Sequence, residues 1–264
     1  MKYFNLGILS LFLLFLAGCQ ESTDPTQDLS RLEGSTETLL NFSGEEGEII
    51  ALTEGQTMTL KYQRMYPNQV RAFFIGSDYV NQLLDQKSAL GVRFYLGLDG
   101  AQQYQLIGAG VDNTGSDLLD RTIIHATISC TDCNSASPLW HGDKSQAINI
   151  PVSVNDGETI DLDHAQMFTH FYQKLFPKGQ KAFYFGQDVL QELLNEPGAQ
   201  GLWLYMGINE IDELEILPTI EFDASSARYI EIGPAKVADR SSVCPPYCDG
   251  DSDGYGSPLL IQYD

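Results

Sequence analysis

The sequence predicts an α+β fold built from two tandem copies of one α-β-α-β-β module. The main observation is an internal repeat: residues 47–99 laid over residues 157–209 without gaps are identical at 19 of 53 positions. The other two are helical periodicity early in each copy and alternating apolar residues later in each copy. We therefore expect modules at residues 47–145 and 146–264. Each should have a small, mostly antiparallel sheet with helices on one face.

Each copy begins with a predicted helix. Apolar residues recur at helical spacing in both copies, namely Met58, Tyr62 and Met65, and Phe168, Tyr172 and Leu175. Thr53 and Asp163 each stand three positions before a glutamine, a capping-box pattern that predicts the N-cap at these residues. Pro67 and Pro177 should end the helices, because proline cannot continue a helix interior.

A strand, a short second helix and two more strands follow in each copy. The expected strands are residues 72–75, 92–98 and 104–111 in the first copy, with 182–185 and 214–222 at matching places in the second. Alternation over residues 92–98 predicts a half-buried strand. Asp99-Gly100 predicts a tight hairpin, and residues 209–213 predict a longer acidic turn in the second copy.

Aromatic residues are concentrated on the predicted strands. They are Phe73, Phe74, Tyr95, Phe183, Tyr184, Trp203 and Tyr205. If helices cover only one face of each sheet, exposed aromatic side chains on the other face could bind a glycan or a protein. The alternative is that these side chains pack in the core or between the modules.

The start of the chain has the features of an export signal. Lys2 supplies a positive charge, and residues 6–16 form an apolar run. This run is too short to span about 30 Å of hydrocarbon as a helix, but it has the length of a secretory signal. It ends in Leu16-Ala17-Gly18-Cys19, where small residues precede a cysteine.

This stretch resembles the lipobox of bacterial lipoprotein precursors in order, spacing and position. The resemblance implies removal of residues 1–18 as a signal peptide and acylation of Cys19, which anchors the chain in a membrane by palmitate-like chains. Gln20, where inner-membrane lipoproteins carry Asp, implies the outer membrane. Residues 19–46 are polar without periodicity, and we expect them to be a lipidated flexible tether. An ordinary signal peptide followed by an unrelated cysteine is the alternative.

The chain is strongly acidic. It has 15 Lys and Arg against 36 Asp and Glu, a formal net charge of −21. Such a body repels nucleic acid and anionic lipid headgroups, so we expect no nucleic-acid partner and no direct attraction of the folded part to anionic lipid. It attracts divalent cations or a basic partner, unless the charge serves solubility alone.

Four cysteines remain after Cys19, one pair in each copy: Cys130 and Cys133, and Cys244 and Cys248. In an exported protein we expect these to form disulfides. Three connectivities are open, and the duplication favours the two local pairs, because each copy is then self-contained. A thioredoxin-like redox centre and a four-cysteine zinc site are the alternatives.

Three alternating aspartates follow the last cysteine pair. Asp249, Asp251 and Asp253, with Gly254 next, match the first half of an EF-hand-type calcium loop. Position 12 of that loop is Leu260 instead of a bidentate glutamate. We therefore expect either weak calcium binding or only a polar turn.

No catalytic motif accounts for the function. The four histidines are His125, His141, His164 and His170, and none forms an H-E-x-x-H motif. We expect a lipid-anchored envelope protein with a non-catalytic binding or assembly role, facing the periplasm or the surface. Its partner would be an envelope protein or a glycan. An envelope hydrolase or thiol-redox enzyme is the alternative.

Overall fold

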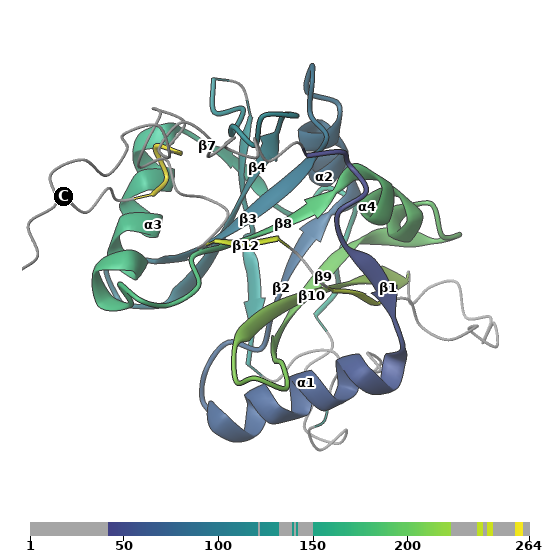
Figure 1. Cartoon of the computed structure of the whole chain (residues 1–264), viewed down its shortest axis with the longest axis vertical. Helices are drawn as coiled ribbons and strands as arrows, with labels where there is room; N and C mark the ends of the chain where they lie inside the picture. The colour runs from purple at the N-terminus through teal and green to yellow at the C-terminus, as the bar shows by residue number, and fades with distance from the viewer. Residues whose placement is uncertain are drawn as a thin grey trace, which may run out of the picture. The chain divides into compact units, whose positions relative to one another are not determined.

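A computed structural model describes residues 42–120, 122–131, 139, 141, 150–222, 237–239, 242–244 and 257–260. The described residues all belong to one compact unit. They form four helices and two antiparallel sheets, which confirms the α+β class (Figure 1). No helix in these ranges is long and apolar enough to cross a membrane.

Each sheet contains six described strands. The first sheet has the order β1 (Glu48–Ile50), β11 (Val237–Asp239), β10 (Leu214–Phe222), β9 (Ala199–Ile208), β2 (Ala72–Gly76) and β6 (Ile128–Cys130). The second has the order β12 (Ser242–Cys244), β8 (Ala182–Gly186), β3 (Gly91–Leu98), β4 (Tyr104–Val111), β5 (Ile123–His125) and β7 (Glu158–Ile160). Strands at matching places in the two copies occupy matching places in the two sheets.

Each sheet takes strands from both halves of the chain. β2 of the first half pairs with β9 of the second, with Phe74 opposite Trp203. β8 of the second half pairs in the same way with β3 of the first, with Phe183 opposite Phe94. The expectation that each module closes its own sheet is therefore wrong, because each half contributes three described strands to each of the two sheets.

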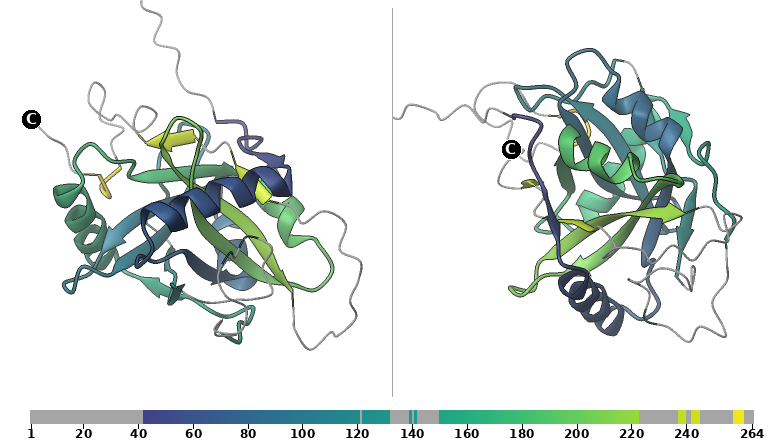
Figure 2. Two further views of the ribbon diagram at one scale, coloured as in Figure 1. Left: turned by 90° about the horizontal axis from the view of Figure 1, so that it is seen from below. Right: turned by 90° about the vertical axis from the view of Figure 1, so that its right-hand side faces the viewer.

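The helices lie in two environments. α1 (Leu52–Met65) packs on β9 and α3 (Leu162–Leu175) packs on β3, each on the face of its sheet away from the other sheet. α2 (Ser77–Leu84) and α4 (Gln187–Leu194) contact strands of both sheets (Figure 2). The expectation that helices cover one face only is also wrong.

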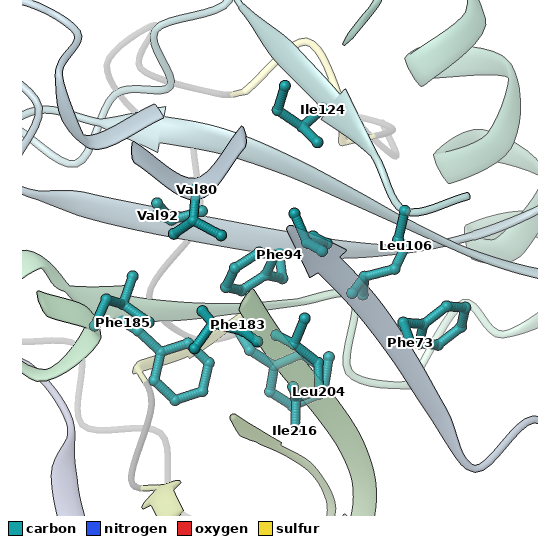
Figure 3. Close-up of a cluster of buried hydrophobic side chains, with 14 of the residues drawn as sticks. Phe73, Val80, Val92, Phe94, Leu106, Ile124, Phe183, Phe185, Leu204 and Ile216 are labelled. Atoms are coloured by element: carbon teal, nitrogen blue, oxygen red, sulfur yellow. The ribbon is translucent and has the colours of Figure 1, made fainter. Parts of the chain in front are cut away.

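The largest buried cluster lies between the two sheets and draws side chains from both. Among its members are Phe73, Phe94, Phe183 and Leu204 (Figure 3). Neighbouring side chains on the same strands point the other way, and they are buried beneath α1 or α3, as Phe74 and Tyr95 are. Residues 91–98 are consequently buried on both faces, so the half-buried strand expected there is wrong.

The segment that precedes the first strand of each copy also forms hydrogen bonds with the other half. The amide of Gly186 donates to the carbonyl of Glu46 (2.7 Å), and the amide of Gly76 donates to the carbonyl of Asp156 (2.7 Å). Residues 42–46 therefore belong to the compact unit, whereas the sequence analysis had placed them in the tether.

The helices begin earlier than the capping patterns predict. The N-cap of α1 is Ala51, which makes no side-chain cap. The N-cap of α3 is Asp161, whose carboxylate accepts a hydrogen bond from the amide of His164 (2.9 Å). Thr53 and Asp163 lie inside the first turn, so the predicted N-caps are wrong by two residues.

The helix ends agree with the prediction, whereas the hairpins do not. α1 and α3 stop two residues before Pro67 and Pro177. The turns after β3 and β9 have the same length, because Leu98 pairs with Tyr104 as Ile208 pairs with Leu214. The tight two-residue hairpin in the first copy is therefore wrong. The left-handed residue there is Gln102, with φ of 60°.

Glycine at the strand-to-helix junctions permits this close approach. A Cβ added to Gly76 would lie 2.3 Å from the carbonyl oxygen of Val154, and one added to Gly186 would lie 2.2 Å from that of Gly44. We predict that Gly76→Ala lowers the free energy of unfolding by about 1–3 kcal/mol, since backbone must move. Urea denaturation checks this, with Gly100→Ala as the control because a Cβ there meets nothing within 4 Å. Equal midpoints for Gly76→Ala and wild type would contradict the prediction.

Candidate functional site

Most site residues expected from the sequence lie outside the described residues. They are Cys19, Cys133, Cys248, Asp249, Asp251 and Asp253. Cys130, at the end of β6, is disulfide-bonded, and Cys244 ends β12. The local pairing and the calcium loop stay predictions. Within the described ranges, no group of three or more His, Cys, Asp or Glu is arranged to hold a metal ion.

The sequence reasoning missed one pattern in the same stretch. Residues 250–254 read Gly-Asp-Ser-Asp-Gly, which has the spacing of a nucleophile elbow. That spacing has catalytic meaning only at a strand-to-helix turn beside a histidine and an acid. These residues also lie outside the described ranges.

Three histidines are each held by neighbours of their own. The contacts are His125 Nδ1 to Glu158 Oε1 (2.7 Å), His125 Nε2 to Gln105 Oε1 (2.8 Å), His164 Nδ1 to Asp161 Oδ1 (2.7 Å) and His141 Nε2 to Thr59 Oγ1 (3.0 Å). Burial lowers the pKa of His141 and of His170, so both rings are neutral near pH 7.

A buried ion pair joins β3 to the loop after β4. The guanidinium of Arg93 donates to the carboxylate of Asp117 and to the carbonyl of Gly115 (3.1 Å). Both charged side chains are at most 3% exposed. Burial alone would lower the pKa of Arg93, but the adjacent Asp117 carboxylate and Tyr95 hydroxyl together outweigh it and raise that pKa.

Two hydroxyls complete this network. Tyr95 and Ser257 both donate to the second carboxylate oxygen of Asp117. Ser257 lies near the end of the chain, and its neighbour Leu259 is buried beneath α3. The network therefore fastens the C-terminal segment to the second sheet. Because the ion pair is buried, we assign it a structural role.

The aromatic side chains on the strands are all in the interior. Phe73, Phe74, Tyr95, Phe183, Tyr184, Trp203 and Tyr205 are at most 1% exposed. The hypothesis of an open aromatic sheet face that binds a glycan or protein is therefore wrong. The alternative, packing in the core, is what the structure shows, because α1 and α3 cover the outer faces.

Exposed apolar side chains gather instead where α1 and α3 end. Met65 is the last residue of α1 and Tyr66 follows it, and they are 48% and 41% exposed. Leu175 and Phe176 occupy the matching positions at the end of α3 and are 52% and 41% exposed. We call these four residues the helix-end patch. The helical pattern had predicted Met65 and Leu175 to be on the buried side, which is wrong.

Buried tyrosines bring the two helix ends together. The rings of Tyr62 and Tyr66 lie 5.1 Å apart, those of Tyr104 and Tyr172 lie 6.1 Å apart, and Phe176 lies 5.0 Å from Tyr172. Burial raises the pKa of Tyr104 and Tyr172, and the nearby Tyr66 raises both further. Tyr62 of the first half and Tyr172 of the second belong to the same buried cluster, so both pairs of patch residues border the same part of the core.

The two chain segments that contain the helix ends are basic, in contrast to the chain as a whole. Residues 61–71 and 171–181, which contain the helix ends, carry six basic residues and no acidic residue. The basic residues are Lys61, Arg64, Arg71, Lys174, Lys178 and Lys181. The helix-end patch is therefore apolar with a basic border, on a chain that is acidic overall.

No protein-family model, curated protein or solved structure matches the chain.

Proposed function

We propose that this protein is a lipid-anchored component of the bacterial cell envelope with a non-catalytic binding or assembly role. The observation that carries the proposal is the lipobox pattern Leu16-Ala17-Gly18-Cys19 directly after an apolar run of signal length. Acylation of Cys19 by more than one chain would give stable anchoring. Gln20 supports the outer membrane as the location.

The helix-end patch supports the binding role. Surface clusters of large apolar side chains cost free energy in water and mark sites of interaction in soluble proteins. Here Met65 and Leu175, and Tyr66 and Phe176, are exposed at matching positions on the two halves. Their recurrence makes a contact surface at this end the best-supported functional feature of the described residues.

The anchor is tested with Cys19→Ser. We expect wild-type protein in the membrane fraction, with the peptide that begins at Cys19 carrying the added mass of acyl chains. Cys19→Ser should stay with the soluble fraction, because the thiol that accepts the lipid is gone. Ser22→Ala, three residues further on, is the matched control and should behave as wild type. A wild-type chain with residue 19 unmodified would overturn the proposed anchor.

A further inference from the structure

We propose that the helix-end patch and the exposed side of α3 dock on an anionic phospholipid surface. The inference rests on the proposed envelope location, and it identifies the partner of the helix-end patch as a lipid bilayer. It does not depend on the acyl group itself, because the docking residues all lie in the folded part.

The exposed side of α3 is apolar along most of its length. Met167, Phe171 and Leu175 are spaced by four residues, so they lie on one side of the helix, and they are 43%, 44% and 52% exposed. α1 carries Thr57 and Lys61 at the positions that match the first two. The fold therefore does not require apolar residues there. A helix with an apolar side open to solvent and lysines beside it is typical of helices that lie in a membrane interface.

Positive charge is concentrated on the α3 side of the patch. Lys61 near the end of α1 is paired with Asp212 of an acidic turn (2.7 Å). Arg64, Lys174 and Lys178 have no ion-pair partner among the described residues. These side chains are therefore available to phosphate groups.

The acidity of the rest of the chain does not prevent this contact. Charges are screened beyond about 8–10 Å at physiological ionic strength, so the headgroups respond mainly to the side chains that face them. The sequence-based expectation of repulsion from anionic lipid considered only the net charge. The fold places Lys174 and Lys178 at the end of α3, whereas the carboxylate of Asp212 lies beside Lys61 at the end of α1.

A bilayer can contact both the apolar side chains and the basic side chains of this surface at once. Lysine side chains place their methylene groups along apolar surface and their ammonium groups among phosphates. Leu175 and Phe176 can enter the boundary of headgroups and acyl chains, and the ring of Tyr66 suits the same depth. A second copy of this chain fits less well, because a symmetric contact through α3 would bring Lys174 and Lys178 near their own equivalents.

The test uses the mature chain with Cys19→Ser, so that no acyl chain contributes. Flotation with phosphatidylcholine vesicles, with and without phosphatidylglycerol, measures binding. We expect binding to the phosphatidylglycerol vesicles to be at least about tenfold tighter and to weaken as salt is added. Lys174→Glu with Lys178→Glu should lower the affinity by about tenfold or more. Lys87→Glu, an exposed charge reversal after α2, is the matched control and should bind as the parent does.

A second variant tests the apolar part. Met167→Thr installs the residue that α1 has at the matching position, and Phe171→Gln leaves the charge unchanged. Together they should lower vesicle binding by about tenfold, with an unchanged melting temperature as evidence of folding. Absence of binding to either vesicle would overturn the inference. Dimerisation that this variant abolishes, without vesicle binding, would assign the surface to a second copy instead. Vesicle binding together with an unmodified Cys19 in wild type would support the inference and overturn the anchor alone.

Discussion

Asp117→Ala is expected to lower the free energy of unfolding by about 3–5 kcal/mol, the range for breaking a buried ion pair by removing one partner. Arg93 is 2% exposed, so its guanidinium would stay buried without the carboxylate that balances its charge. Tyr95 and Ser257 would lose their acceptor at the same time. Chemical denaturation followed by circular dichroism measures the loss, which would be large against the total stability of a typical domain.

The double variant Arg93→Met with Asp117→Leu is the matched comparison. It removes both charges, so no uncompensated charge stays buried, and apolar replacements of buried ion pairs are often tolerated. The second half of the chain supports this, because the position that matches Arg93 is Trp203, which is also buried. We expect the double variant to lose less stability than Asp117→Ala. An equal or greater loss would show that packing, not charge, governs this site.

Separating the halves between Ser145 and Gln146 is expected to abolish the native monomer. β2 and β3 belong to the same half but lie in different sheets, each paired with a strand of the other half. Among the described strands, four pairings join the halves, namely β1–β11, β2–β9, β3–β8 and β5–β7. Either half alone would therefore expose these strand edges and its own part of the largest core cluster. We expect each half to be unfolded or associated, and an equimolar mixture to recover the native circular dichroism spectrum and a single unfolding transition.

Size-exclusion chromatography with light scattering provides the measurement. Dimers formed by one half would agree with strand pairing between the halves, because the two halves offer equivalent strand edges. A half that is a stable monomer with native secondary structure would contradict it. The whole chain with an intact 145–146 bond, run beside the mixture, is the control for the native mass.

The elements themselves could be predicted because their signals are local. Pro67 and Pro177 end helices by removing a backbone donor, whatever surrounds them. The capping prediction failed by two residues, since Thr53 and Asp163 match the pattern but Ala51 and Asp161 have the extended backbone that an N-cap needs.

Burial was less predictable, because it depends on what covers each residue. Met65 and Leu175 continue the helical pattern, but each is the last residue of its helix and is about half exposed. Arg93 and Tyr95 alternate with apolar residues but are buried, because a second layer covers the outer side of β3. Net charge likewise did not reveal that basic residues meet at one end.

The sequence by itself determined the α+β class and placed β2, β3, β4, β8 and β10 to within about one residue, because periodicity, proline and glycine act over a few neighbouring residues. It did not predict the three-residue strands β1, β5, β6, β7, β11 and β12, which are too short to carry a periodic pattern. Only the tertiary structure decided which strands pair across the halves, that Arg93 has a buried partner in Asp117, and that Tyr62 and Tyr172 share one buried cluster. Two copies of one module present nearly the same strand edges. Pairing within a copy and pairing between copies therefore give the same local pattern, and only contacts distant in sequence distinguish them.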